Sequence, residues 1–468
     1  FPVEYYKDTL TGTTLCDYLT RQFEKQVSQY SFRAKGSGKS GLLTVSHCGQ
    51  EILSRTACEI TEKGITARFF VGFPANGRTI NATELEKILF DFLPVCIQKS
   101  FFYSSLNAKE LQNYIELAED QEFIRQTLPA KNLCAFIADG SILPRESGIS
   151  SRPMKASVPF TSPDSLRISI NLPHKGKITG MGIPKGITLI VGGGYHGKST
   201  LLNALELGVY NHIPGDGREY VITDATAVKL RSEDGRFIKD VDISMFINDL
   251  PNKKDTRCFS TLDASGSTSQ AAGIAESMEA GSHLFLLDED TSATNFMVRD
   301  AFMQQVIQRE KEPITPFLER AEDLYKKAGI STILVAGSSG AFFHIADTII
   351  QMDNYVPKDI TASVKKLCSQ YPLPAVSVTD FQLPHSHRIM SRPAESSKRL
   401  RHNSRGNHSD SGATKPERLK TRISGTDGFS LGRQEIDLRY TEQLIDAEQT
   451  AAIVADPNDV NKRFARSL

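Results

Sequence analysis

Nine consecutive residues have the types and the spacing that bind the phosphates of a nucleotide. They are Gly192, Gly193, Gly194, Tyr195, His196, Gly197, Lys198, Ser199 and Thr200, which fit the pattern G-x-x-x-x-G-K-[ST]. Glycines let backbone N–H groups turn inward around phosphate oxygens. Lys198 would reach the β- and γ-phosphates, and the Ser199 hydroxyl would be a ligand of Mg²⁺. We therefore predict a site for ATP and Mg²⁺; the alternative is a glycine-rich turn that happens to contain a lysine.

The segments on either side of these nine residues would position them. Residues 186–191 form an apolar run that predicts a short buried strand, and residues 201–206 predict a helix. A phosphate-binding loop needs this context, because the helix N-terminus directs its positive dipole at the phosphates.

A second group of candidate residues is acidic. Residues 284–287 are apolar and run directly into Asp288, Glu289 and Asp290, as a buried parallel strand does when it ends at a site. Asp288 would hold Mg²⁺ together with Ser199, and Glu289 would polarise an attacking water. The alternative is a core strand that ends in a solvated acidic turn.

A third group is small and polar. Residues 264–270 read Ala-Ser-Gly-Ser-Thr-Ser-Gln, and they open a helix predicted over residues 270–279. At a helix N-terminus the Ser265 Oγ and the Gly266 N–H can point at a phosphate. A serine- and glycine-rich loop without a ligand is the alternative for this segment alone.

The order and spacing of these groups resemble the ABC-type ATPases. Residues 264–270 are similar to that family's signature L-S-G-G-Q, and the 23 residues from Ser265 to Asp288 match the family's spacing. Residues 291–295 look like its D-loop. In that family two chains pair head to tail, and the signature of one covers the γ-phosphate held by the other. The resemblance therefore implies a homodimer in which Lys198, Glu289, Ser265 and Gly266 are catalytic.

A wider set of segments is similar to one small family, the predicted ATPases of the ABC class, which lack membrane spans. The segments are 180–184, 211–219, 232–236, 264–270, 288–297 and 312–316, with a looser match at 436–439. One eukaryotic branch of that family is the ATPase of the trypanosome mitochondrial RNA-binding complex, linked to RNA editing. Membership of this branch would imply RNA as a partner, a multiprotein RNA-processing complex and the mitochondrial matrix; otherwise the cytoplasm is expected.

The sequence also departs from the ABC pattern. Transporter-type members carry a histidine after the next strand, but here the predicted strand 332–336 is followed by Gly337, Ser338 and Ser339. His344 lies further on, in a predicted helix. The γ-phosphate sensor is therefore missing or replaced, with Ser338 as the candidate. Neither a Q-loop glutamine nor an adenine-stacking aromatic upstream of Gly192 is identified.

Bulk composition narrows the class of protein. A chain of 468 residues with 39% hydrophobic residues suits an α/β protein of two or three domains. The 55 basic and 55 acidic residues balance, so any surface for nucleic acid must be local. Seven scattered cysteines with no C-x-x-C argue for a reducing compartment and against a zinc site. No apolar run approaches the roughly 18–20 residues of a membrane span. Because the chain starts at Phe1, a targeting segment could precede it.

The predicted architecture is α/β and has three parts. An N-terminal α+β domain covers 1–160, an ABC-type ATPase core with a mostly parallel sheet covers 161–370, and a C-terminal region covers 371–468. Core strands are expected near 167–171, 187–191, 284–287 and 332–336, with another over 220–229. Elsewhere we expect strands at 41–45 and 66–71, helices at 85–92, 108–126 and 435–454, and a turn at Asn76-Gly77.

Local positive charge supplies the candidates for RNA binding. Residues 388–422 hold ten Lys or Arg against three acids and no aromatic residue, which predicts a disordered basic segment. This segment is an RNA-binding arm or a solvated linker, and an arm without aromatics would bind RNA of any sequence. Residues 35–40 are likewise a basic loop that grips phosphates or a plain solvated loop. The scattered candidates are Lys35, Lys39, Arg68, Arg78, Arg145, Arg152 and Lys155.

Three functions are compatible with these features. The first is a homodimeric ATPase that couples hydrolysis, whether fast or slow, to RNA binding or remodelling. The second is a scaffold for RNA or protein partners that ATP clamps without turnover, which the absent histidine favours. The third is a kinase for a small molecule, against which the signature-like segment 264–270 argues, because a kinase has no use for it.

Overall fold

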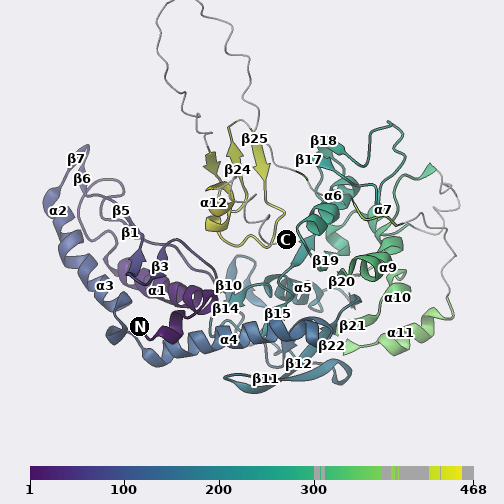
Figure 1. The fold of residues 1–468 in the computed structure, drawn as a ribbon, viewed down its shortest axis with the longest axis horizontal. Helices are drawn as coiled ribbons and strands as arrows, with labels where there is room; N and C mark the ends of the chain where they lie inside the picture. The colour runs from purple at the N-terminus through teal and green to yellow at the C-terminus, as the bar shows by residue number, and fades with distance from the viewer. Residues whose placement is uncertain are drawn as a thin grey trace, which may run out of the picture. The chain divides into compact units, whose positions relative to one another are not determined.

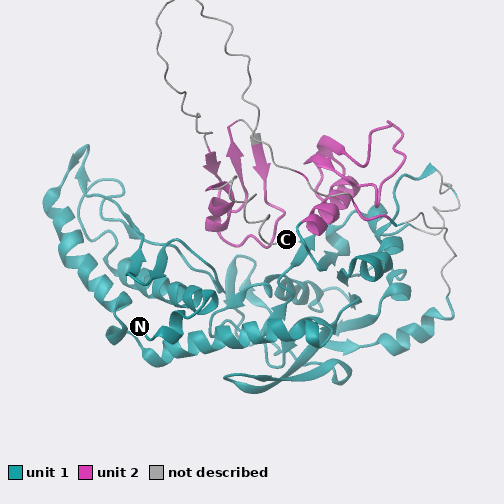
Figure 2. Cartoon of the chain, viewed as in Figure 1, with its two compact units in different colours: residues 1–231, 280–381 teal, residues 232–279, 382–468 magenta. Residues whose placement is uncertain are grey.

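The computed structural model describes residues 1–299, 306, 311–371, 381–384, 388, 421–432 and 434–455. They belong to two compact units, drawn in different colours in Figure 2. Unit 1 combines residues 1–231 with 280–381, and unit 2 combines 232–279 with 382–468. The units are spatial, so the predicted division of the sequence at 160 and 370 stays a prediction. Most of the basic segment 388–422 lies outside the described residues.

The central sheet of unit 1 is mostly parallel, as predicted (Figure 1). Its strands, in spatial order, are β16 (Ala227–Leu230), β19 (Leu284–Asp288), β20 (Ser331–Val335), β13 (Ile187–Val191), β21 (Thr348–Asp353) and β22 (Val356–Asp359). Only β22 is antiparallel to its neighbour. Every residue of β19 and β20 is buried, which explains their mostly apolar sequences, because both faces of a parallel sheet are covered.

Helices cover this sheet. They are α5 (Lys198–Leu207), α9 (Phe317–Ala328), α10 (Phe342–Ile345) and α11 (Thr361–Cys368). Leu201, Leu202 and Leu205 of α5 pack in one core with Leu286 of β19 and Ile333 of β20. The residues that alternate with these on the strands are buried too, so the second face is also covered.

A second sheet in unit 1 is antiparallel. Its strands, in spatial order, are β11 (Arg167–Leu172), β12 (Gly176–Pro184), β8 (Leu133–Ala138) and β15 (Val221–Thr223). The long helix α4 (Ala108–Ala130) contacts β8, β11 and β15. The prediction of one strand over 220–229 is wrong, because the chain turns at Asp224, whose Oδ1 accepts the Thr226 N–H at 2.8 Å. The segment therefore contains two strands, of which β15 belongs to this sheet and β16 to the parallel sheet.

The N-terminal part of unit 1 mixes helices with very short strands, as expected of an α+β region. Its helices are η1 (Val3–Tyr6), α1 (Thr9–Tyr30), α2 (Ala82–Glu86), the π-helical turn η2 (Lys87–Phe92), α3 (Leu93–Phe101) and η3 (Tyr103–Ser105). Its strands are β1 (Leu43–Thr44), β2 (Glu51–Ile52), β3 (Cys58–Thr61), β4 (Gly64–Ala67), β5 (Phe70–Val71), β6 (Ala75–Asn76) and β7 (Thr79–Ile80). The turn at Gly77 is confirmed, but the single strand expected over 66–71 is divided between β4 and β5.

The remaining elements of unit 1 connect these sheets. They are the hairpin of β9 (Arg145–Ser147) and β10 (Ser150–Pro153), η4 (Asp164–Leu166), β14 (Asn211–His212), η5 (Glu289–Thr291) and α7 (Thr294–Met297). β14 pairs with β2, which joins the N-terminal part to the core.

Unit 2 contains the hairpin of β17 (Arg236–Val241) and β18 (Phe259–Ala264), followed by α6 (Gly266–Glu279). It also contains a small sheet of β23 (Thr421–Ile423), β24 (Gly428–Leu431) and β25 (Gln434–Asp437), and the helix α12 (Ala447–Ala455). The helix predicted over 435–454 is therefore wrong in its first half. The Asp437 carboxylate accepts the Arg439 N–H at 3.0 Å and ends the strand in a turn.

The described residues contain neither a membrane-spanning helix nor a disulfide. Within the described part of the chain, no helix is both long enough and apolar enough to cross a membrane. All seven cysteines lie in that part, and none forms a disulfide.

Candidate nucleotide-binding site

The predicted phosphate loop joins β13 to α5 and requires glycine at two points. Gly192 has φ +145° and Gly197 has φ +96°, a region in which other residues are strained. A Cβ on Gly192 would lie 2.4 Å from the Met352 carbonyl oxygen of β21. The neighbouring strand therefore leaves no room for a side chain, and the loop turns where the sequence places its glycines.

The loop has open hydrogen-bond donors at the position expected for phosphates. Helix α5 begins at Lys198, and its N-cap, Gly197, provides no side chain to accept the first N–H groups. Ser199 and Thr200 follow in the first turn. The Lys198 Nζ donates to the carbonyl oxygens of Gly192 at 2.7 Å and Gly193 at 2.9 Å. These features fit a polyphosphate, because a helix N-terminus and a lysine ammonium both favour a bound anion.

The turn between β21 and β22 supports the loop from the side. The Asn354 N–H donates to His196 Nδ1 at 2.9 Å, and the Tyr355 N–H donates to the His196 carbonyl oxygen at 3.2 Å. The Tyr355 ring would contact a Cβ on Gly197 at 3.1 Å. His196 is thus held by a hairpin more than 150 residues away in sequence, a contact that the sequence pattern did not reveal.

Tyr195 lies within the glycine-rich phosphate loop, and its side chain projects into solvent. Its φ is +63°, and the side chain is 99% exposed. A tyrosine in this conformation costs of order 1 kcal/mol relative to glycine. Burial does not offset that cost, because the residue is almost completely exposed.

Asp288, the predicted metal ligand, ends β19 and is buried. Burial raises the pKa of its carboxyl; the Asp290 N–H, Lys229 and Lys198 oppose this change, while the charge of Asp290 adds to it. No described cluster of three or more His, Cys, Asp or Glu side chains could hold a metal ion alone. Asp288 and the Ser199 hydroxyl nevertheless fit Mg²⁺, which usually takes one or two protein ligands and completes its shell with phosphate and water.

Glu289, the predicted general base, contacts the loop that follows β20. Its Oε2 accepts the N–H groups of Gly337 at 2.7 Å and Ser338 at 2.9 Å, and its Oε1 accepts the Ser338 hydroxyl at 2.5 Å. Burial disfavours the charged form of Glu289 and would raise its pKa. The hydrogen bonds from these donors favour the charged form more strongly, so the pKa of the carboxyl is lowered. Ser338 stands after β20, where the transporter-type family members have their histidine, and here it contacts the candidate base.

Ser265 and Gly266, the signature-like pair, stand at the N-terminus of α6 in unit 2. The helix begins at Gly266, four residues earlier than predicted. Ser265 is exposed, and its Oγ lies 3.0 Å from the Thr268 Oγ1. The Glu233 N–H donates to the Ser269 Oγ at 2.9 Å, so the segment after Arg231 fixes the start of the helix. Both residues therefore have the expected position at a helix end, in a different unit from Lys198.

One of the segments that resemble the ATPase family, 211–219, forms a buried ionic cluster in unit 1. Asp216 and His212 are fully buried, with Oδ2 and Nδ1 3.0 Å apart. Arg145 of β9 donates to the Asp216 carboxylate at 2.9 Å, and Arg218 donates to Asn203 of α5 at 3.0 Å. The cluster thus connects this segment with the helix that starts at Lys198. Sequence reasoning singled out the segment but gave it no role.

The structure brings only some of the predicted RNA-binding residues together. The loop with Lys35 and Lys39 is bound to the 72–77 segment through Ser37 N–H to Ala75 O at 2.8 Å and Gly41 N–H to Gly72 O at 2.8 Å. Arg78 lies exposed in the adjoining turn, whereas Arg145 is committed to Asp216. Arg68 pairs with Glu59. Arg152 on β10 and Lys155 beyond it are exposed in another hairpin region.

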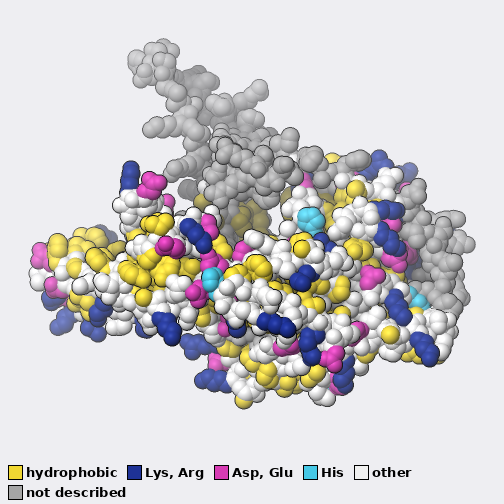
Figure 3. Space-filling view, turned by 60° about the horizontal axis from the view of Figure 1, so that its bottom comes forward, with side chains coloured by type: hydrophobic (Ala, Val, Ile, Leu, Met, Phe, Trp, Pro, Cys, Tyr) yellow, Lys and Arg dark blue, Asp and Glu magenta, His cyan; other side chains and the backbone are white. Residues whose placement is uncertain are grey.

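Exposed aromatic side chains accompany the Lys35–Arg78 group. Phe70 is 74% exposed and lies on β5, which pairs with β1, and Phe73 is 54% exposed and lies in the segment to which the Lys39 loop is bonded. Figure 3 shows hydrophobic and basic side chains gathered at the end that carries α2, β6 and β7 in Figure 1. We call Lys35, Lys39, Phe70, Phe73 and Arg78 the N-terminal patch.

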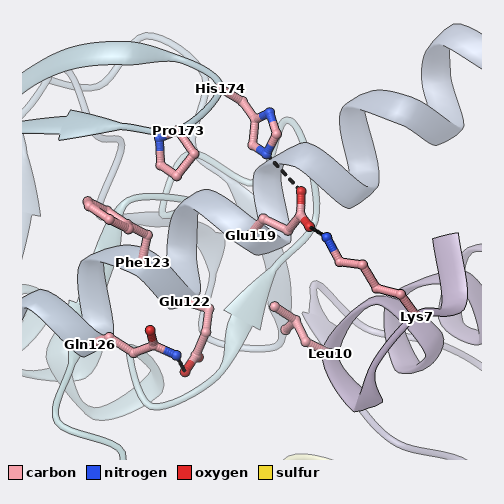
Figure 4. A pocket seen from close by; sticks show the side chains of 8 residues that line it. All are labelled: Lys7, Leu10, Glu119, Glu122, Phe123, Gln126, Pro173 and His174. Carbon is pink, nitrogen blue, oxygen red and sulfur yellow. Dashed lines mark hydrogen bonds and ion pairs between the residues drawn. The ribbon is translucent and has the colours of Figure 1, made fainter. Parts of the chain in front are cut away.

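A surface pocket of about 350 Å³ lies elsewhere in unit 1, among η1, α1, α4 and the β11–β12 turn (Figure 4). It is lined by Lys7, Leu10, Glu119, Glu122, Phe123, Gln126, Pro173 and His174. Glu119 pairs with Lys7 at 2.5 Å and with His174 at 2.7 Å, so one carboxylate already contacts both basic residues. None of the lining residues belongs to the predicted nucleotide site.

Two family models match the sequence. A model described as the P-loop domain of ABC ATPases matches residues 107–386, and a model described as the N-terminal part of ATPases of the ABC class matches residues 1–104. The chain is also similar to the uncharacterised protein MJ1628 of Methanocaldococcus jannaschii, with 31% identity over 266 residues. The match covers 54% of this chain and 58% of that protein, so it spans less than two thirds of the relative.

Solved structures with a related P-loop fold include components of transporters. One is MJ1267, an ATP-binding cassette of an ABC transporter in its ADP conformation, with 13% identity, 42% of this chain and 88% of that chain covered, and a TM-score of 0.28. Another is cbiO1 of Clostridium perfringens, part of the transporter complex cbiONQ, with 13% identity, 41% and 86% covered, and a TM-score of 0.26.

Proposed function

The chain belongs to the ABC-class ATPases, and from that premise we propose that it is a homodimeric ATPase whose hydrolysis is coupled to RNA binding or remodelling. The observation that carries the proposal is the arrangement around Glu289. Ser338 and Gly337 fix the Glu289 carboxylate in its ionised form at the end of β19, where it can orient an attacking water, although the lowered pKa makes it a weaker proton acceptor.

In this proposal each site residue of unit 1 has its own role. The N–H groups at the start of α5 and the Lys198 ammonium hold the phosphates of ATP. Ser199 and Asp288 would be the protein ligands of Mg²⁺, which supplies charge neutralisation at the β- and γ-phosphates when it is bound. Glu289 orients a water for in-line attack on the γ-phosphate and takes its proton.

A second copy completes the site in this proposal. Ser265 and Gly266 of that copy would place a hydroxyl and an N–H at the γ-phosphate held by the first copy. Support comes from their position at the start of the buried helix α6, where donors are oriented before the ligand arrives. Closure of the dimer on ATP and its opening after hydrolysis would provide the mechanical step.

RNA is proposed as the polymer because of the N-terminal patch. Exposed phenylalanines can stack on unpaired bases, and lysines beside them can contact the phosphate backbone, which is how proteins bind single strands without reading sequence. The family branch resembled in sequence would place this activity in a mitochondrial RNA-processing complex. The binding of RNA by the N-terminal patch and the place in a mitochondrial complex are both part of what we propose.

The first experiment is a measurement of ATP hydrolysis by the full chain, with and without single-stranded RNA, at low and physiological salt. We expect turnover that rises with RNA and an RNA affinity that falls as salt increases. The double variant Phe70→Ser and Phe73→Ser should lose the stimulation while keeping RNA-independent turnover. Stimulation that survives this change would remove the N-terminal patch from the proposal.

The role of Glu289 is tested by Glu289→Gln, which keeps the shape of the side chain and removes the base. We expect ATP binding to remain, turnover to fall by at least about 100-fold, and the dimer to persist on ATP. Lys198→Ala is the contrasting variant, because it should weaken ATP binding itself. Undiminished turnover in Glu289→Gln would show that another group acts as the base.

A second function is favoured by one observation. Both carboxylate oxygens of Glu289 already accept hydrogen bonds from the 337–338 loop, as expected if the residue is structural and ATP only clamps a scaffold. Phosphate release distinguishes the two, because a clamp binds ATP tightly without steady turnover. The kinase hypothesis has no feature of the site in its favour.

A further inference from the structure

Tyr195 has a conformation and an exposure that the folded chain alone does not explain. Its backbone is left-handed, with φ +63°, where glycine is favoured, and its side chain is 99% exposed. Glycine would relieve the strain, and removing the ring would uncover nothing. The chain therefore bears a strained, solvated aromatic ring at the centre of its phosphate loop, which is how residues that serve a ligand or a partner differ from residues that serve the fold.

Tyr195 differs from the other aromatic residues that have a positive φ. Three aromatic residues in the described chain have a positive φ, namely Phe32, Tyr195 and Tyr355. Tyr355 contacts the phosphate loop with its ring and donates its N–H to His196. Phe32 is 61% exposed and donates its N–H to Gly41 in the N-terminal part. Tyr195 alone combines the strain with a completely exposed ring at the predicted nucleotide site.

The signature-like region of unit 2 carries a matching exposed apolar surface. Leu262 on β18 is 81% exposed, and Phe237 on the paired strand β17 is 56% exposed. Leu262 stands three residues before Ser265, which along a strand corresponds to about 10 Å. If Ser265 of a second copy reaches the phosphates held by Lys198, Leu262 of that copy is brought close to the loop that displays Tyr195.

We propose that Tyr195 of one copy packs on Leu262 and Phe237 of the second copy when the dimer closes on ATP. The inference rests on the proposed head-to-tail dimer and adds a specific contact to it. In a twofold dimer the contact occurs twice, so each closure buries two rings that are solvated in the open chain. A buried tyrosine beside the phosphates also excludes water from the reaction, apart from the one held by Glu289.

The test compares ATP-dependent dimerisation of full-length variants by sedimentation velocity, in a Glu289→Gln background that stops turnover. Tyr195→Gly should weaken the dimer by about tenfold or more, as loss of a central tyrosine does at other interfaces. Leu262→Ser should do the same while its monomer binds ATP like the parent, because Leu262 lies outside the nucleotide site. Phe32→Gly is the matched control, since it removes a ring with the same backbone strain and substantial exposure, and it should leave the dimer unchanged.

Mixing the two variants distinguishes direct pairing from an indirect effect. In a mixed dimer, the Leu262→Ser copy provides Tyr195 and the Tyr195→Gly copy provides Leu262, so one of the two contacts is intact. The mixture should therefore dimerise more strongly than either variant alone. A mixture no stronger than its components would overturn the pairing.

The remaining outcomes separate this inference from the proposed function. If the parent chain stays monomeric with ATP, the head-to-tail dimer fails and the inference fails with it. If the parent dimerises and both variants dimerise equally well, only the inference is overturned. If Tyr195→Gly loses ATP binding as a monomer while Leu262→Ser dimerises normally, the ring serves the nucleotide and the pairing is again overturned.

Discussion

At the scale of single residues, the contact between Glu289 and Ser338 fixes the orientation of the candidate base. Oε2 accepts the N–H groups of Gly337 and Ser338, and Oε1 accepts the Ser338 hydroxyl. The Ser339 N–H is a further donor to this carboxylate. Ser338 is therefore a positioning residue, which contacts both oxygens of the base.

Replacing Ser338 by alanine tests this role. We expect kcat to fall by about tenfold, because one hydrogen bond to a charged group is lost, while KM for ATP stays close to the parent value. Ser338→Thr keeps the hydroxyl and should restore most of the rate. Equal kcat in Ser338→Ala and the parent, measured by steady-state phosphate release, would contradict a positioning role.

At the scale of elements, the phosphate loop is shaped by the strand beside it. β21 runs parallel to β13, and its Met352 carbonyl oxygen occupies the space next to Gly192. The β21–β22 turn then holds His196 through two backbone N–H groups. The shape of the loop is consequently set by the sheet, since neighbouring strands fix its beginning and its side.

Gly192→Ala should disrupt this arrangement. The added Cβ meets a backbone oxygen at 2.4 Å, and the residue is forced to keep φ +145°, so we expect a loss of about 2 kcal/mol or more in unfolding free energy. Thermal unfolding and ATP binding should both be impaired. Gly194→Ala is the control, because its Cβ would meet nothing within 4 Å, and it should leave the melting temperature nearly unchanged.

At the scale of the whole unit, the Asp216 cluster joins the N-terminal part to the ATPase core. The segment 211–219 is bonded to β2 through β14, to α4 through Gln121 and His212, and to α5 through Arg218 and Asn203. Burial opposes the charge of Asp216, but His212 and then Arg145 outweigh it and lower the pKa of the carboxyl. Hydrogen bonds and ion pairs of this segment therefore connect the N-terminal part with helix α5.

Asp216→Asn should destabilise unit 1 by about 3 kcal/mol at neutral pH, because it leaves Arg145 buried without its partner charge. Since the folded pKa of Asp216 is lowered, its contribution is complete above the unfolded value of about 4 and is lost as the pH falls through the folded value. The difference between variant and parent should thus shrink below about pH 4. Denaturant unfolding at pH 7 and pH 3 would measure it.

A matched control for this change is Asp164→Asn, which breaks the ion pair with Arg167. Asp164 is 91% exposed, so solvent screens the pair and we expect a much smaller effect. A loss in Asp216→Asn no larger than in Asp164→Asn would mean that the cluster does not hold unit 1 together.

The sequence by itself determined the features that depend on neighbouring residues. The glycines and Lys198 form one contiguous loop, and the apolar run before Asp288 is long enough to specify a buried strand. These predictions succeeded because the geometry of a strand, a turn or a helix start is set within a few residues. The strand over 220–229 and the helix over 435–454 failed where a single aspartate turns the chain, at Asp224 and at Asp437.

Only the tertiary structure decided which distant residues meet. Glu289 and Ser338 are 49 residues apart in the chain, His196 and Asn354 are 158 apart, and Arg145 and Asp216 are 71 apart. No local pattern encodes such pairs, because they follow from the order of strands in the sheet and from which loops emerge at the same edge. For the same reason Arg145 reads in sequence as one more surface cation, while in the folded chain it is the partner of a buried aspartate.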